Sequence, residues 1–545
     1  MKNTRFYIAA MAVAILFVAS CQKESLVRQE FSARMEADAS DAKTTLVGNV
    51  LQWQRGSDQV SITSIATTTE NNQTTTSVTT STFTAVENTN YPNDYSYAFL
   101  SLNQGETELA ESTNNTNVTY RAIYPAGAAR ENNTKIVLPR VQESTSGELT
   151  KYPMYAESSS KSLQFKNLCS VLKLSLKGSG TINKIELVTD KYINGTFTVS
   201  NPANTTTPLT SETYNENNVQ HSTIGDHTKV TTLTMSTPQA LSSTTAKYFY
   251  IYLPVQEYKY IKINIYNTDG NVYTKEAIFP CTINNTTVNS LTLERSKYHL
   301  ISFQSVAFVP GLLNGEFSVA SNQKVSFAKG NLLSNGSSYK FAEKQYNKSE
   351  TGYTTSYFNW YGNNSNSMDE RNSNITNGAG TTWHVLTQGE WNYLFTSRSV
   401  TYYRWALVSV TKADGSSVAH GILIFPDVFY WPLEGNNQPR PFDASGSYYG
   451  HTWTGGDHPN ITYTYDEWCI LEAAGCAFLP ITGYKTNNTG DVQQSDYGYY
   501  WTRDSYSSSS AYCFRFYNAG ATFSTSSSVR LNTANGLAIR HAKYL

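Results

Sequence analysis

Serine, histidine and cysteine side chains would have to carry any covalent chemistry in this chain. The stretch GYYWTRDSYSSSSAYCFRF, residues 498–516, contains four consecutive serines, Ser507–Ser510. A nucleophilic serine needs a base beside it and a tight turn that presents it, and the sequence has no G-x-S-x-G motif of that kind. The serine run therefore predicts a turn that joins two strands, GYYWTRD and SAYCFRF. In these strands we expect Trp501 in the core, and we expect one face to hold Tyr512, Phe514 and Phe516.

The cysteines also argue against catalysis. Cys21 lies near the N-terminus, and five others follow at irregular spacing in apolar surroundings. A reactive thiol needs an electropositive setting that favours the thiolate, and a zinc site needs closely paired ligands. We therefore expect small buried side chains and no enzymatic activity. A Cys169–Cys281 disulfide stays open as an alternative; the five cysteines are Cys169, Cys281, Cys469, Cys476 and Cys513.

A glycine-rich loop at residues 436–464 holds the best candidates for ligand recognition. Binding residues concentrate on loops that a rigid scaffold displays, and tyrosine and tryptophan offer large contact areas at low entropy cost. Calcium takes about six to eight oxygen ligands, more than the local carboxylates supply. No metal or cofactor is therefore expected, although calcium at Asp457 and Asp466 stays open as an alternative. The ligand-binding candidates are Tyr448, Tyr449, His451, Trp453, Asp457 and His458.

The N-terminal segment has the pattern of an export signal. Lys2 and Arg5 precede an apolar run, and small residues then lead to Cys21. The run is too short to span a bilayer, so residues 1–20 predict a signal peptide. The small residues before Cys21 resemble the lipobox of bacterial lipoproteins. This resemblance implies that Cys21 carries the lipid and that the lipid is the only membrane anchor, with a polar tether at residues 21–43. An ordinary signal peptide with an incidental cysteine stays open.

The composition is that of a β-rich extracellular protein. Of the 545 residues, 15% are charged, the net charge is -1, and 39 residues are tyrosine. Because no basic cluster is present, electrostatic binding to nucleic acid is not expected. Period-2 alternation and turn signals such as Asp269-Gly270 recur along the N-terminal half of the chain. They predict two tandem β-sandwiches, at residues 44–160 and 161–303.

The region at residues 312–545, which follows a linker at residues 304–311, changes character. It contains the pattern T-x-x-E-W twice. A threonine followed three residues later by glutamate forms a capping box at the start of a helix. Two short helices among aromatic-rich strands predict an α+β domain. The capping pairs are Thr387–Glu390 and Thr464–Glu467, the expected core residues are Trp391, Leu394, Phe395, Trp468 and Leu471, and Gly475 is expected to end the second helix.

The segments KTTLVGNVLQW, GSDQVSI, YRAIYP, IVLP and PMYAESSSKSLQFKNLCSVLKLSLKG follow one another between residues 40 and 303. In this order of motifs the chain resembles the fimbrillin-like lipoproteins of Bacteroidetes. The resemblance implies two transthyretin-like β-sandwiches and a place as a shaft, anchor or tip subunit of a fimbria, or pilus. It also implies assembly by strand exchange between subunits, through main-chain hydrogen bonds. Shaft subunits are cleaved after an arginine, for which this chain offers Arg28, Arg34 and Arg55, none of them in a clear processing motif.

The segments WHVLTQGEW, YDEWCILEAAGCAFLPITGY, GYYWTRD and LAIRH resemble a Bacteroidetes surface module with a C-type-lectin-like fold. That module is also similar to the domain of formylglycine-generating enzymes. The calcium-binding motif of sugar-binding lectins is not visible in this chain. The resemblance therefore implies the lectin-like layout and leaves the ligand open.

These patterns predict a lipid-anchored protein of the outer membrane and cell surface that acts as a fimbrial tip or accessory adhesin. Its expected partners are fimbrial subunits, joined by strand exchange, and a host or bacterial surface ligand such as a glycan. The main alternative is a stand-alone surface lipoprotein that binds glycans or proteins and does not polymerise. The remote alternative is an enzyme of the formylglycine-generating type.

Overall fold

The structure is a computed structural model, and its fold is mainly β. The described residues form two short α-helices, α2 (Gln388–Thr396) and α3 (Tyr465–Ala473). Both lie in the C-terminal region, which confirms the predicted combination of a β-rich N-terminal part with two short helices. The residues that the structure describes are 29–36, 52–144, 151–211, 227–283, 286–360, 375–433, 462–488, 490–519 and 522–545.

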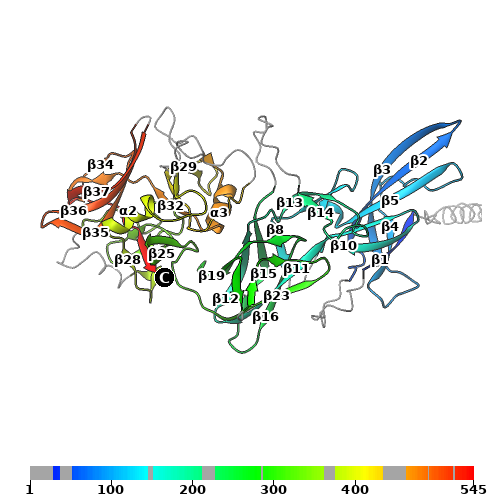
Figure 1. Ribbon diagram of the computed structural model, residues 1–545, viewed down its shortest axis with the longest axis horizontal. Helices are drawn as coiled ribbons and strands as arrows, with labels where there is room; N and C mark the ends of the chain where they lie inside the picture. Colours follow the sequence, from blue (N-terminus) through cyan, green and yellow to red (C-terminus); the bar gives the residue numbers. More distant parts are fainter. Residues whose placement is uncertain are drawn as a thin grey trace, which may run out of the picture. The chain divides into compact units, whose positions relative to one another are not determined.

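The chain forms two compact units whose segments alternate along the sequence (Figure 1). The described part of the first unit comprises residues 29–36, 52–127 and 155–166. The second unit takes in residues 128–154 and all residues from 167 onward. The predicted boundary between residues 160 and 161 does not coincide with this division. Three strands between residues 129 and 144, before the boundary, belong to the second unit, and the strand at residues 162–167, after it, belongs to the first unit apart from its last residue.

Seven strands of the first unit close into a barrel, in the order β1-β10-β9-β5-β2-β3-β4. Trp53 is buried among these strands and contacts Tyr124 and Phe165 edge to face, with ring centroids 5.5 and 5.4 Å apart. The period-2 alternation of residues 50–55 in the sequence predicts a strand at Trp53, but the described residues 52–54 lie outside any strand. The strands of the barrel are β1 (Glu30–Met35), β2 (Gln59–Glu70), β3 (Gln73–Val86), β4 (Tyr97–Leu102), β5 (Thr116–Tyr124), β9 (Met154–Ser158) and β10 (Ser162–Asn167).

The second unit begins with two facing sheets, in the orders β19-β18-β12-β15-β8 and β16-β11-β23. Leucine and isoleucine side chains from both sheets share one core, as in a β-sandwich. A smaller sheet has the order β14-β13-β7-β6. The main strands are β6 (Ala129–Arg130), β7 (Lys135–Leu138), β8 (Val141–Ser144), β11 (Cys169–Gly178), β12 (Thr181–Thr189), β13 (Gly195–Val199), β14 (Leu209–Ser211), β15 (Val230–Ala240), β16 (Lys247–Pro254), β18 (Tyr260–Asn267), β19 (Val272–Ile278) and β23 (Tyr298–Val306); the short ones are β17 (Glu257–Tyr258), β20 (Cys281–Ile283), β21 (Thr286–Val288) and β22 (Leu291–Thr292).

The C-terminal region of the second unit, residues 312–545, contains several small sheets. We call this region the C-terminal module. Its larger sheets have the orders β24-β25-β38-β28, β31-β29-β30-β32 and β35-β36-β37. Its strands are β24 (Phe317–Ala320), β25 (Gln323–Phe327), β26 (Leu332–Ser334), β27 (Tyr339–Phe341), β28 (His384–Val385), β29 (Trp405–Thr411), β30 (Val418–Ile424), β31 (Thr462–Tyr463), β32 (Ala477–Pro480), β33 (Tyr484–Lys485), β34 (Val492–Gln493), β35 (Gly498–Ser507), β36 (Ser510–Ala519), β37 (Thr522–Asn532) and β38 (His541–Tyr544).

Both helices start at the predicted capping boxes. The Thr387 hydroxyl accepts from the Glu390 amide, and the Glu390 carboxylate accepts from the Thr387 amide, at 3.2 and 2.7 Å. The same reciprocal pair joins Thr464 and Glu467. Gly475 follows α3 with φ +106°, a conformation that favours glycine. The predicted core residues of the helices are buried, as expected, and they are Trp391, Leu394, Phe395, Trp468 and Leu471.

The C-terminal module and the sandwich pack within one unit. The carbonyl oxygen of Ala473, at the end of α3, accepts hydrogen bonds from the side-chain amides of Asn264 and Asn314, at 2.8 and 2.9 Å. The expected linker at residues 304–311 is partly built into sheets, because β23 extends to Val306 and Val309 forms a bridge with Val272.

Candidate functional site

The serine run forms the turn of a hairpin. Strand β35 ends at Ser507 and β36 begins at Ser510, which confirms the predicted hairpin, although β35 continues three residues past the expected end at Asp504. The hydroxyls of Ser507 and Ser510 lie 2.8 Å apart and bond to each other across the turn. Trp501 is fully buried, and its indole nitrogen donates to the carbonyl oxygen of Phe358, at 2.6 Å. The hairpin is therefore scaffold along most of its length.

The predicted faces of β36 are confirmed only in part. Phe514 and Phe516 are buried in the core around α2. Cys513, on the opposite face, is also buried, in a second core with Trp501. Tyr512 lies beyond both cores and is half-buried. A strand that is buried on both faces cannot show a simple alternation of apolar and polar residues, so the sequence pattern missed the second core.

The cysteines have the surroundings of structural side chains. Cys169, Cys476 and Cys513 are buried as expected, whereas Cys281 and Cys469 are only half-buried. All five described cysteines are free thiols, so Cys169 and Cys281 do not form a disulfide. Burial raises the pKa of Cys169, Cys476 and Cys513. A thiol whose pKa is raised stays protonated at neutral pH and is a poor nucleophile. The absence of enzymatic activity stays a prediction.

All six predicted ligand-binding residues, the predicted lipid-anchor cysteine and one candidate for proteolytic processing lie outside the described residues. They are Cys21, Arg28, Tyr448, Tyr449, His451, Trp453, Asp457 and His458. Asp466, the other calcium candidate, is exposed in the first turn of α3, and its carboxylate lies 3.7 Å from the Arg140 guanidinium. Within the described ranges, no group of three or more His, Cys, Asp or Glu side chains has the arrangement of a metal site. No described helix is both long and apolar enough to cross a membrane.

An exposed cluster at the outer end of the sheet β35-β36-β37 was not predicted as a binding site. The Arg530 guanidinium lies 3.6 Å from the centroid of the Tyr506 ring and 5.6 Å from that of Tyr512. The two tyrosine rings meet edge to face, at 5.7 Å, and half of the Tyr506 surface is accessible to solvent. Stacking on an aromatic face holds a guanidinium in place. Its N–H groups, which lie in the plane of the guanidinium, stay available to donate hydrogen bonds to a ligand. We call these three residues the Tyr–Arg cluster.

The sequence signal for the Tyr–Arg cluster is present but easily misread. Tyr506 stands between two serines, in a segment whose neighbours Ser505 and Ser507 are exposed. Tyrosine among serines is typical of recognition loops. Arg530 is more than twenty residues away in sequence and reaches the tyrosines only because β37 pairs with β36, placing it opposite Tyr512.

Strand β1 occupies a distinct place in the barrel of the first unit. It pairs in parallel with β10 and antiparallel with β4, and these two strands have no other link in the barrel order. Its inward side chains Phe31, Ala33 and Met35 are buried. Phe31 contacts Phe83 and Tyr120 edge to face, at 5.2 and 4.9 Å. Removal of β1 would therefore leave an apolar groove with a free strand edge on each side.

The chain is similar to solved structures only at a low level. A proposed cell adhesion protein from Bacteroides ovatus shares 13% identity over 52% of this chain and 94% of its own, with a TM-score of 0.30. A corresponding protein from Bacteroides fragilis shares 10% identity over 50% and 92% of the two chains, with a TM-score of 0.25. The tip fimbrial protein Mfa3 from Porphyromonas gingivalis, with C-terminal truncation, shares 9% identity over 51% and 96%, with a TM-score of 0.22.

These values do not assign the chain to a family. No family model matches it, and no curated protein matches it.

The two described arginines that were considered for proteolytic processing have different surroundings. Arg34 lies within β1, and its side chain is exposed over the ring of Tyr97, at 5.0 Å from the centroid. Arg55 donates to four main-chain carbonyl oxygens and stacks on Tyr95, at 4.6 Å. A cut after Arg34 would divide β1, whereas a cut after Arg55 would separate the whole of β1 from the rest of the barrel.

Proposed function

We propose that this protein is a lipid-anchored cell-surface subunit that serves as a fimbrial tip or accessory adhesin. It joins other subunits by β-strand exchange and binds its ligand through the C-terminal module. The observation that carries this proposal is β1, a short strand that completes the barrel through backbone pairing on both edges and three buried apolar side chains. Such a strand can be replaced by one of similar pattern from another molecule, which is β-augmentation.

The C-terminal module supports a tip or accessory position over a shaft position. Its last strand, β38, pairs with β25 on one side and with β28 on the other. His541 and Ala542 of this strand are fully buried. A strand held in the middle of its own sheet is not available as a donor for a neighbouring subunit, so β38 does not serve as one, and we assign the accepting role to the groove at β1.

Strand exchange at β1 can be tested with a peptide. In a variant lacking residues 22–36 the groove between β4 and β10 is open, and we expect it to bind a synthetic peptide of residues 29–36. A peptide with Phe31→Asp is expected to bind at least about tenfold more weakly, because a charge would enter the apolar barrel; this corresponds to about 1.4 kcal/mol. Isothermal titration calorimetry measures both affinities.

The full chain provides the control for this experiment, since its own β1 fills the groove. Equal binding of the peptide to the full chain and to the shortened variant would contradict the proposal. In the cell, the protein is expected to co-purify with sheared fimbriae. Recovery only as a monomer from membrane extracts would favour the alternative of a stand-alone glycan- or protein-binding lipoprotein.

Within the described part of the C-terminal module, the Tyr–Arg cluster is the ligand site that we propose. Its guanidinium can donate to hydroxyl or carboxylate oxygens of a glycan, and the exposed face of Tyr506 can pack on a sugar ring. On a glycan array, the full chain is expected to retain specific sugars, and Arg530→Ala is expected to reduce that signal at least about tenfold, or about 1.4 kcal/mol. Lys259→Ala, which removes an exposed cation from the sandwich, is the matched control and should leave the signal unchanged.

A blank array for the full chain would count against a glycan ligand and would leave a protein ligand as the alternative. The remote alternative, an enzyme of the formylglycine-generating type, needs a reactive cysteine. The raised pKa of Cys476 and of Cys513 speaks against it.

A further inference from the structure

The outer edge of β3 is an unpaired sheet edge, which the proposed strand exchange does not use. Strand β3 pairs with β2 from Gln73 to Thr84 on one side. On its other side, within the described residues, it pairs with β4 only over Phe83–Val86. Figure 1 shows the β2–β3 hairpin projecting beyond the neighbouring strands. We call the stretch Gln73–Val78 the β3 edge.

At alternate residues of the β3 edge, the backbone N–H and C=O groups are directed away from β2. Asn71 and Asn72, both with positive φ, form the two-residue turn between Glu70 and Gln73. The residues that flank such a turn exchange both backbone hydrogen bonds, so Gln73 bonds inward to β2. Two residues further on the pattern repeats, which leaves the N–H and C=O groups of Thr74, Thr76 and Val78 directed away from β2.

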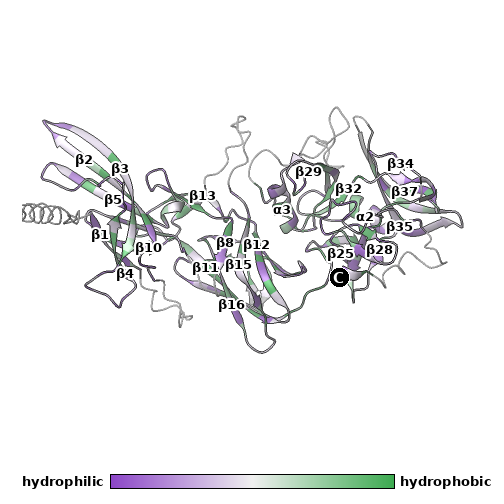
Figure 2. Cartoon of the chain, turned by 180° about the vertical axis from the view of Figure 1, so that it is seen from behind, coloured by the Kyte–Doolittle hydropathy of each residue, from purple (hydrophilic) through white to green (hydrophobic). Residues whose placement is uncertain are grey.

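The β3 edge lacks the features by which proteins protect exposed edges. Charged residues and proline on an edge strand prevent pairing with other chains. Strand β3 contains neither, whereas the edge strand β19 carries Lys275 and Glu276. The side chains of the β3 edge are exposed on both faces of the hairpin, and Val78 has 46% of its surface accessible. In Figure 2 the tip of the β2–β3 hairpin has the hydrophilic colour, and the adjoining part of the hairpin is paler.

We propose that the β3 edge is an interface that pairs antiparallel with the β3 edge of a second copy of this chain. We choose the register in which Thr76 of one molecule lies opposite Thr76 of the other. In this register Thr74 of each molecule faces Val78 of the other. All outward backbone groups of the edge then find partners, and Glu70 of one copy stays away from Glu70 of the other. No charges of the same sign come to face each other, as self-pairing requires.

The sheet already uses the side-chain contacts that this pairing would extend. Threonine hydroxyls bond across its strands between Thr68 and Thr116, at 2.9 Å, and between Thr69 and Thr74, at 3.3 Å. In the proposed register Thr76 would face Thr76 of the second copy and add one more cross-strand threonine pair to the sheet. Cross-strand threonine pairs of this kind contribute to sheet stability.

A charge-swap experiment tests this pairing. The mature full chain is expected to dimerise as its concentration rises in analytical ultracentrifugation. In Thr76→Lys two lysines would face each other across the axis, and in Thr76→Glu two glutamates would do so. Each variant is expected to show at least a tenfold higher dissociation constant. An equimolar mixture of the two variants is expected to recover the dimer, because lysine then faces glutamate.

The controls separate this interface from other modes of association. Asn114→Lys, at an exposed position in the bend that precedes β5, should leave the dimer intact, and so should removal of residues 22–36, which abolishes exchange of β1. Far-UV circular dichroism checks that the variants are folded. A chain that stays monomeric, a dimer that tolerates Thr76→Lys, or a mixture of the two variants that stays monomeric would each overturn the proposal.

Discussion

Replacing Asp427 by alanine is expected to lower the free energy of unfolding by about 3–5 kcal/mol, because it leaves a buried guanidinium without its counter-charge. Arg398 is fully buried, and its Nη1 donates to Asp427 Oδ1 at 2.9 Å. Asp427 also accepts from the backbone amide and the hydroxyl of Ser318. Burial lowers the pKa of Arg398 to about 10, and Asp427 acts in the opposite direction. Urea unfolding followed by tryptophan fluorescence measures the loss.

The position of Arg398 explains why the effect should be large. Its Nε donates to the carbonyl oxygen of Leu394, near the end of α2, and its Nη2 donates to the carbonyl oxygens of Arg404 and Phe425. The guanidinium therefore ties the helix to the strands β29 and β30. Loss of Asp427 removes the only acidic partner of Arg398 within 4 Å in the described part of the chain.

A matched control is the exposed ion pair between Lys259 and Glu257. Glu257→Ala also removes one carboxylate from an ion pair, but from a pair whose side chains are about half exposed at the surface, where such pairs contribute little. Its unfolding transition should coincide with that of the unmodified chain. An Asp427→Ala transition that also coincides would show that solvent reaches Arg398 and that the pair is not buried in solution.

The local features of this fold could be predicted from the sequence. The capping boxes at Thr387 and Thr464 and the turn at Ser507–Ser510 depend on residues that are close in the chain. Their hydrogen bonds form within one turn of helix or hairpin, so neither the partner strands nor the long-range order of the sheets affects them. These predictions are confirmed for that reason.

The long-range pairing could not be predicted in the same way. Strand β1 reaches β10, more than a hundred residues away, and β8 pairs with β15 of the same unit across the intervening segment of the first unit. Alternation identifies a strand but carries no information about its partner, so a boundary drawn from strand signals misses segments that alternate between units. The Tyr–Arg cluster was missed for the same reason, since Arg530 meets Tyr506 only through sheet pairing.

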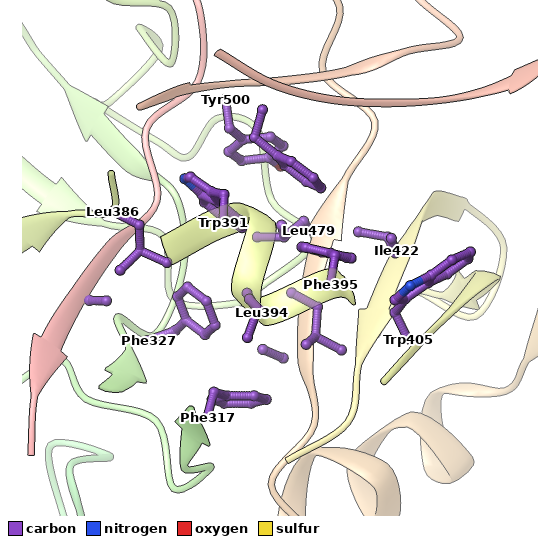
Figure 3. Packing of buried hydrophobic residues seen from close by; sticks show 14 of the residues in the cluster. Phe317, Phe327, Leu386, Trp391, Leu394, Phe395, Trp405, Ile422, Leu479 and Tyr500 are labelled. Atoms are coloured by element: carbon purple, nitrogen blue, oxygen red, sulfur yellow. The ribbon is translucent and has the colours of Figure 1, made fainter. Parts of the chain in front are cut away.

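The second large effect is expected at Trp391, in the helix α2. Trp391→Ala is expected to lower the free energy of unfolding by about 3–5 kcal/mol, from lost apolar contact and the cavity left behind. The Trp391 ring is fully buried and stacks on Phe514, with centroids 4.6 Å apart and the planes at 2°. Figure 3 shows Trp391, Leu394 and Phe395 directed into one core with residues of several strands. Thermal unfolding followed by circular dichroism measures the change.

A milder variant separates packing from polarity at this position. The indole nitrogen of Trp391 is buried without a hydrogen-bond acceptor among the described residues, and burying such a donor is costly. Trp391→Phe removes this donor and keeps a ring against Phe514, so it should destabilise the chain less than Trp391→Ala. Asn392→Ala, at the neighbouring exposed position of α2, should change stability by less than about 0.5 kcal/mol. If Trp391→Phe were as damaging as Trp391→Ala, stacking on Phe514 would not be what holds the helix in place, and its anchorage would rest on Arg398 instead.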